Sequence, residues 1–232
     1  MDYEHIKSAT LKVFIDCNVK SFPIDCFEIL EFYKLKAHSY ESLPAKLKEY
    51  CIKYSDDALN YKDKICYNSD LPPGRIRFSL MHELGHVILK HSQNRTQELE
   101  QEANFFASNI LAPRMAIHYA GCKNQNDVSK LFHITDEAAH YAFADYKRWH
   151  RWTIYHKMNS FDKAMYSYFY NVEQEKFIYS VKRCAFCEHE IFNSPEYICK
   201  KCNISNYHQP QEIAYDTDLL IAESQWLYGG IG

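Results

Sequence analysis

The residues best suited to chemistry form a His-Glu-Leu-Gly-His string at positions 82–86. On a helix, His82 and His86 lie one turn apart on one face, so two imidazoles can hold one metal ion. Glu83 then lies beside that ion and can accept a proton from a water molecule bound there. This arrangement is typical of zinc-dependent hydrolases, with Glu83 as the general base.

A catalytic zinc ion needs a third protein ligand and one open position. The segment 96–111 has helical periodicity, and its apolar stripe consists of Leu99, Ala103, Phe106 and Ile110. Glu102 lies at the edge of this stripe, where a buried carboxylate needs a partner of opposite charge. We therefore predict Glu102 as the third ligand, with Glu98 as the less favoured alternative. A three-histidine zinc site would need another histidine six residues after His86, but Ser92 occupies that position.

These residues predict hydrolysis of a peptide bond. Glu83 would take a proton from a zinc-bound water, which attacks the carbonyl, and would then pass the proton to the leaving amine. The strand expected near 64–68 could pair with an extended substrate, although a purely structural strand is an equal alternative. The donor to the oxyanion stays open among five candidates, which are His118, Tyr119, His140, Tyr141 and Tyr155.

A second metal site is predicted by two Cys-x-x-Cys pairs. The four cysteines are Cys184, Cys187, Cys199 and Cys202. Their spacing matches a zinc ribbon, with both pairs expected on β-hairpins. Four thiolates leave no open position, so this zinc would be structural. The scattered cysteines are expected to be small buried hydrophobic residues; they are Cys17, Cys26, Cys51, Cys66 and Cys122.

The periodicity predicts a mostly helical chain with a small sheet. Expected helices cover 3–19, 25–33, 42–50, a segment from about 75 that carries the motif, 96–111, 126–132 and 136–149, and a strand is expected within 59–68. Gly85 would let the helix over 96–111 approach the motif helix closely.

The segment 126–149 resembles a helix-turn-helix. Its second helix begins with Asp136 and Glu137, where a helix that reads DNA usually presents basic or amide side chains, so a structural or docking role is favoured. The basic and aromatic string 146–152 could stack on single-stranded nucleic acid, but a solvated helix end is the preferred interpretation.

Composition and charge indicate a cytoplasmic protein. The net charge of −3 offers no general attraction to nucleic acid, and 47% of residues are hydrophobic. The chain shows no signal sequence and no apolar stretch long enough for a membrane, so we expect reduced thiols rather than disulfides.

The segments 75–86 and 102–113 resemble the ImmA/IrrE family of metallopeptidases, and the similarity extends over about residues 1–150. The resemblance implies zinc bound by His82, His86 and Glu102, with Glu83 as catalytic base. Mild departures occur at four positions, which are Ser79, Met81, Ser108 and Ala112. The family also implies a substrate class, the helix-turn-helix repressors of mobile elements or stress genes.

The sequence thus predicts an α+β protein with two zinc ions, one catalytic and one structural. Its expected parts are a zincin-like metallopeptidase domain (1–125), a connecting region (126–175), a four-cysteine zinc ribbon (176–210) and a C-terminal helix and tail (211–232). The expected function is intracellular proteolysis of a repressor-like protein. The alternative is a non-enzymatic regulator that binds DNA or a repressor, but such a regulator has no need for Glu83 between the two histidines.

Overall fold

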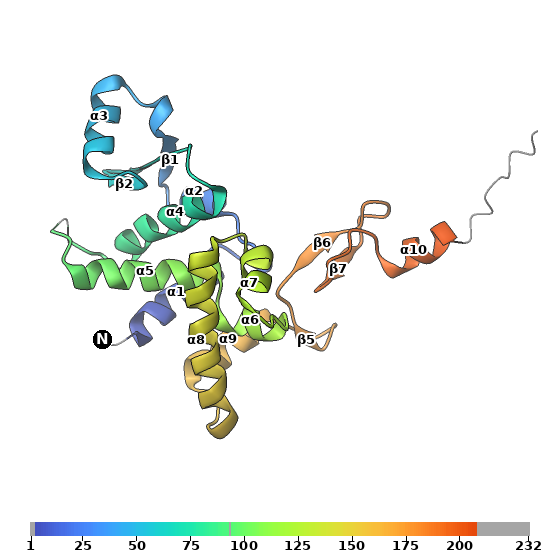
Figure 1. The fold of residues 1–232 in the computed structure, drawn as a ribbon. Helices are drawn as coiled ribbons and strands as arrows, with labels where there is room; N and C mark the ends of the chain where they lie inside the picture. Colours follow the sequence, from blue (N-terminus) through green and yellow to red (C-terminus); the bar gives the residue numbers. More distant parts are fainter. Residues whose placement is uncertain (1–2, 93, 208–232) are drawn as a thin grey trace, which may run out of the picture. The chain divides into compact units, whose positions relative to one another are not determined.

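A computed structural model describes residues 3–92 and 94–207 (Figure 1). The described chain divides into two compact units. The larger comprises residues 3–92, 94–181 and 192–194, and the smaller comprises residues 182–191 and 195–207. The C-terminal helix expected within 211–232 lies outside the described residues.

The larger unit is mainly helical, as expected. Its helices are α1 (Glu4–Asp16), α2 (Cys26–Phe32), α3 (Ala45–Tyr54), α4 (Pro73–Ile88), α5 (Gln97–Leu111), α6 (Arg114–Tyr119), α7 (Gln125–Phe132), α8 (Asp136–Tyr155) and α9 (Ser160–Phe169). Four differ from the prediction. Helix α6 was not predicted, and α8 continues to Tyr155, beyond the expected end at residue 149. The third helix begins at Ala45 rather than residue 42, because Tyr40–Ser42 forms a 3-10 turn ahead of Pro44. Helix α9 lies in an aromatic segment where the sequence predicted no element.

A three-stranded sheet lies beside α4. Its strands are β1 (Lys36–Ser39), β2 (Ala58–Tyr61) and β3 (Lys64–Tyr67), in the order β1-β3-β2. β3 pairs in parallel with β1 and antiparallel with β2. The strand expected near 64–68 is therefore the central one, and both of its edges are occupied. Because a substrate strand can add only to a free edge, that part of the prediction is wrong, and β2 is the edge strand that contacts α4.

Helices α4 and α5 pack side by side (Figure 1). Pro73 stands at the first position of α4, where the missing N–H costs no hydrogen bond, and the Thr96 hydroxyl caps α5 by accepting from the Leu99 N–H. A Cβ placed on Gly85 would lie 3.0 Å from Phe106 Cδ1. This confirms that Gly85 permits the close approach of the two helices. The buried core continues through Phe14, Leu80, Leu84, Phe106, Ile110 and Phe132.

A buried ion pair joins α6, α8 and α9. The Asp162 side chain is 1% exposed and accepts hydrogen bonds from Arg114 at 2.7 Å and from the Trp149 indole at 2.9 Å. Trp149 belongs to the basic and aromatic string 146–152, so part of that string is packed inside. Trp152 remains exposed and stacks on His156.

The remaining strands form two short hairpins. β4 (Tyr170–Asn171) pairs with β5 (Lys176–Phe177), and β6 (Val181–Arg183) pairs with β7 (Glu190–Phe192). The smaller unit also contains α10 (Lys200–Tyr207).

Within the described ranges, no helix is both long enough and apolar enough to cross a bilayer. Of the scattered cysteines, Cys26, Cys51 and Cys66 are buried as expected, whereas Cys17 and Cys122 are only partly so.

Candidate metal centre and cysteine cluster

Three side chains from α4 and α5 converge on one point. His82 and His86, one turn apart on α4, bring their Nε2 atoms to 3.0 Å from each other. Glu100 on α5 places Oε2 at 3.1 Å from His82 Nε2 and Oε1 at 3.4 Å from His86 Nε2. One nitrogen from each histidine and one carboxylate oxygen therefore lie within 4.8 Å of one another. Two imidazole nitrogens and a carboxylate form a donor set that suits zinc and leaves a fourth position open.

The carboxylate at the histidine pair is Glu100, not Glu102, which the sequence predicted. Glu102 instead places Oε2 at 3.1 Å from His91 Nε2. Because a helix turns about 100° per residue, side chains two positions apart point in nearly opposite directions. Measured from buried Ala103, Glu100 lies about 60° to one side and Glu102 about 100° to the other. The helical wheel thus carries a signal for Glu100, whereas Glu98, the alternative predicted ligand, is exposed.

Both histidines are oriented through their second ring nitrogen. His82 Nδ1 lies 2.9 Å from Asn104 Oδ1, and His86 Nδ1 lies 2.9 Å from His91 Nδ1. Because the amide oxygen can only accept, His82 donates from Nδ1 and keeps an Nε2 lone pair. Burial, together with the nearby positive charge of Arg95, lowers the pKa of His86 to about 3. Both rings thus fit a metal ligand, which must be a neutral imidazole.

Glu83 lies in the same cleft. The residue is 2% exposed, and its carboxylate accepts a hydrogen bond from the Asn60 N–H at 3.0 Å. Arg95 donates two more hydrogen bonds to it. The cleft has a volume of about 390 Å³, and its lining includes His82, Glu83, Arg95 and Glu100. Sequence reasoning missed Arg95, since it lies in the loop before α5 and carries no periodic or motif signal.

The five candidates for the oxyanion donor lie elsewhere. They are His118, Tyr119, His140, Tyr141 and Tyr155, on α6 and α8. Among the residues that the structure describes, the lining of the cleft includes none of the five. Its charged donors are Arg75, which is paired with Asp57, and Arg95. Arg95 is therefore the donor placed beside Glu83.

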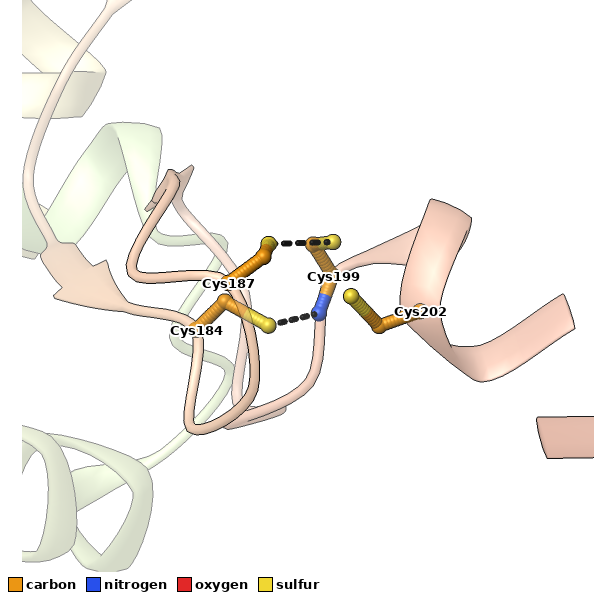
Figure 2. Close-up of side chains that lie close together, drawn as sticks. All are labelled: Cys184, Cys187, Cys199 and Cys202. Atoms are coloured by element: carbon orange, nitrogen blue, oxygen red, sulfur yellow. Dashed lines mark hydrogen bonds between the residues drawn. The ribbon is translucent and has the colours of Figure 1, made fainter. Parts of the chain in front are cut away.

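The four predicted cysteines come together in the smaller unit (Figure 2). Their sulfur atoms all lie within 4.8 Å of one another, as expected for a zinc ribbon. Cys184 and Cys187 lie in the turn between β6 and β7, and the Cys199 N–H donates to Cys184 Sγ at 3.3 Å. This and other backbone N–H groups lower the pKa of the Cys184 thiol to about 6.

The second cysteine pair lies at the start of a helix rather than on a hairpin. Cys199 immediately precedes α10, and Cys202 belongs to its first turn. The positive end of a helix favours thiolates there. Four thiolate ligands would saturate a tetrahedral zinc ion, so the chemistry of this donor set fits a structural metal.

Comparison with known proteins covers the part of the chain that carries the histidine pair. Residues 40–147 match the family model Peptidase_M78, described as the IrrE N-terminal-like domain. A solved structure described as a Mycobacterium tuberculosis transcriptional regulator is similar at a TM-score of 0.40 and 14% identity, over 59% of this chain. This chain spans 45% of that protein's chain. A search of curated protein sequences found no match.

Proposed function

Because residues 40–147 match the M78 peptidase family model, described as the IrrE N-terminal-like domain, we propose that the chain is a zinc-dependent endopeptidase. The observation that supports this most directly is the convergence of His82, His86 and Glu100, with Glu83 in the same cleft. The two histidines would hold zinc through Nε2 and Glu100 through its carboxylate. A bound zinc ion would polarise a peptide carbonyl and lower the pKa of a water molecule.

Glu83 is the proposed proton acceptor. Arg95 holds its carboxylate in one orientation through two hydrogen bonds, which reduces the reorganisation needed during proton transfer. Glu83 then passes the proton to the leaving amine, so it ends the reaction in its starting form.

Arg95 is the proposed donor to the oxyanion. When Glu83 accepts a proton, it loses its negative charge, and a negative charge develops on the carbonyl oxygen of the substrate. The Arg95 guanidinium, already next to Glu83, would then be the positive group in the cleft. Preorganised charge of this kind is usually a large contribution to catalysis.

The edge strand β2 is the proposed binding site for the substrate main chain. Ala58 and Leu59 of β2 belong to the lining of the cleft, and β3 covers only the other edge of the strand. An extended peptide could add to the free edge, and main-chain pairing would tolerate varied side chains. This role replaces the one expected for 64–68.

The proposed substrate is a helix-turn-helix repressor, and the proposed compartment is the cytoplasm. The family supports a protein substrate, and the resemblance noted in the sequence implies a helix-turn-helix repressor. The cysteine cluster fits a metal site rather than disulfides, which favours a reducing compartment such as the cytoplasm.

Co-expression with a repressor encoded beside this gene tests the proposal, with mass spectrometry to detect cleavage. The variant is Glu83→Gln, and Glu98→Gln is the matched control because Glu98 is exposed on α5. We expect Glu83→Gln to retain zinc and to cleave at least roughly 100-fold more slowly than the wild type, while Glu98→Gln cleaves at the wild-type rate. Cleavage by zinc-loaded Glu83→Gln at the wild-type rate would contradict the assignment, and binding without cleavage by the wild type would favour the non-enzymatic regulator.

A further inference from the structure

A buried chain of hydrogen bonds links His86 to Glu102. His91 Nδ1 lies 2.9 Å from His86 Nδ1, and His91 Nε2 lies 3.1 Å from Glu102 Oε2. The His91 side chain is only 4% exposed, and that of Glu102 is 16% exposed. This burial matters because hydrogen bonds to charged groups are stronger when water is excluded. The chain begins at the ring nitrogen of His86 that faces away from Glu100.

The end of α4 places His91 in this position. Lys90, the second residue after the end of α4 at Ile88, adopts a left-handed conformation with φ of 57°. The His91 N–H then donates to the His86 carbonyl at 2.9 Å, a pattern typical of a left-handed helix end. The polypeptide therefore folds back against the end of α4, which places the His91 ring next to the His86 ring.

The proton positions along this chain are mutually consistent. An ionised carboxylate can only accept, so His91 donates to Glu102 from Nε2 and has a lone pair on Nδ1. His86 must then donate to His91 from its own Nδ1. This arrangement leaves the lone pair on His86 Nε2, the atom that lies beside His82 and Glu100.

We propose that His91 and Glu102 position His86 as a metal ligand, an inference that rests on the proposed zinc site. The Glu102 carboxylate polarises the His91 ring, so that His91 Nδ1 accepts more strongly from His86 Nδ1–H and makes His86 Nε2 a better electron-pair donor to the metal. Groups that hold a ligand in this way commonly change metal affinity about 10- to 100-fold. Glu102 thus contributes to metal binding without touching the metal.

Zinc affinity distinguishes this role from direct ligation. The zinc dissociation constant of each full-length variant is measured by competition with a chromophoric chelator, and the catalytic site is recognised as the one missing in His82→Ala. We expect Glu102→Ala and His91→Ala each to weaken zinc binding about 10- to 100-fold while still binding a full equivalent at high zinc. Glu102→Gln should lose less, because its amide oxygen can still accept from His91. Glu98→Ala is the matched control, a truncated glutamate on the exposed side of α5.

A double variant tests whether the two residues act as one unit. Because His91→Ala and Glu102→Ala break the same chain, the double variant should bind zinc about as well as the weaker single variant. Thermal unfolding of the metal-free variants shows whether any loss of affinity reflects loss of folding, and Glu102→Gln, which preserves side-chain size, keeps the test decisive if an alanine variant unfolds.

Several results would overturn the proposal. Unchanged zinc affinity in both His91→Ala and Glu102→Ala would show that the hydrogen bonds from His86 through His91 to Glu102 do not affect metal binding. Complete loss of catalytic zinc in Glu102→Ala and Glu102→Gln would make Glu102 a ligand, and a multiplicative loss in the double variant would make the two residues independent. None of these results bears on cleavage that depends on Glu83, so the proposed peptidase activity stands or falls separately.

Discussion

Arg95 donates to Glu83 from both terminal nitrogens, at 3.1 Å from Nη1 to Oε1 and at 2.7 Å from Nη2 to Oε2. The Glu83 side chain is 3% exposed and that of Arg95 is 29% exposed, so the pair is largely shielded from water. A guanidinium paired with the proposed general base is a feature of the cleft that the sequence did not suggest.

Replacing Arg95 should therefore slow catalysis without removing zinc. We expect Arg95→Gln to lower kcat/KM by about 100- to 1,000-fold, because it removes the positive group beside the reacting carbonyl. Arg95→Lys should lie between Arg95→Gln and the wild type, since it keeps the charge but loses the two-point contact. Steady-state kinetics on a cleaved substrate, with zinc content measured in parallel, checks this. Faster cleavage by Arg95→Gln would mean instead that Arg95 restrains the base.

Replacing Glu100 should remove the catalytic zinc. Because its carboxylate is the one at the histidine pair, Glu100→Ala should reduce metal content from two zinc ions per chain, one at each donor cluster, to the one at the cysteines. Metal analysis by mass spectrometry after dialysis measures this, with Glu98→Ala as the control. If Glu100→Ala kept both ions and Glu102→Ala lost one, the ligand predicted from the sequence would be restored.

Two glycines on α4 should differ in their tolerance of alanine. At Gly74 a Cβ would lie 2.8 Å from the Thr135 nitrogen and 2.9 Å from the Ile134 carbonyl carbon, both backbone atoms. At Gly85 the nearest atom, at 3.0 Å, belongs to the Phe106 ring, which can shift. We expect Gly74→Ala to lower the free energy of unfolding by roughly 2 kcal/mol or more, and Gly85→Ala by less. Urea denaturation measures both, and equal losses would contradict this account of the contacts.

The buried ion pair should matter more than an exposed one. Asp162→Ala leaves Arg114 without its partner in the interior, and we expect the free energy of unfolding to fall by about 3 kcal/mol. The Asp145–Arg148 pair is the control, because the Arg148 side chain is 71% exposed. Asp145→Ala should change stability by less than about 1 kcal/mol. Similar losses in the two variants would show that burial does not set the cost here.

The parts of the site that depend on short spacing could be predicted from the sequence. His82, Glu83 and His86 lie within two turns of one helix, and the pair spacing of the four cysteines has few alternatives to a metal site. Gly85 was also predictable, because a residue without a side chain on the buried face of a helix invites a neighbour. In each case the geometry is determined by residues that lie close together in the sequence.

The parts that depend on tertiary contacts could not be predicted in the same way. The choice between Glu100 and Glu102 depends on the rotation of α5 against α4, which Phe106 and Gly85 set across the interface. Arg95 reaches Glu83 from a loop, and no periodicity describes a loop. The central place of β3 depends on pairing with β1, a strand far away in the sequence.

If a peptide adds to β2 as proposed, the contact between Asn60 and Glu83 would link substrate docking to the state of the proposed base. The Asn60 N–H belongs to the edge strand and is already engaged by Glu83 Oε2 at 3.0 Å. A peptide that extends the sheet at β2 would offer its own carbonyl to the same N–H, so the two acceptors compete for one donor. Arrival of the peptide would then release one oxygen of Glu83 at the moment when a scissile bond is present. Without a peptide in the cleft, Glu83 would stay hydrogen-bonded to the Asn60 N–H. The resting and working forms of the enzyme would then differ in which acceptor, Glu83 or the substrate carbonyl, this N–H binds.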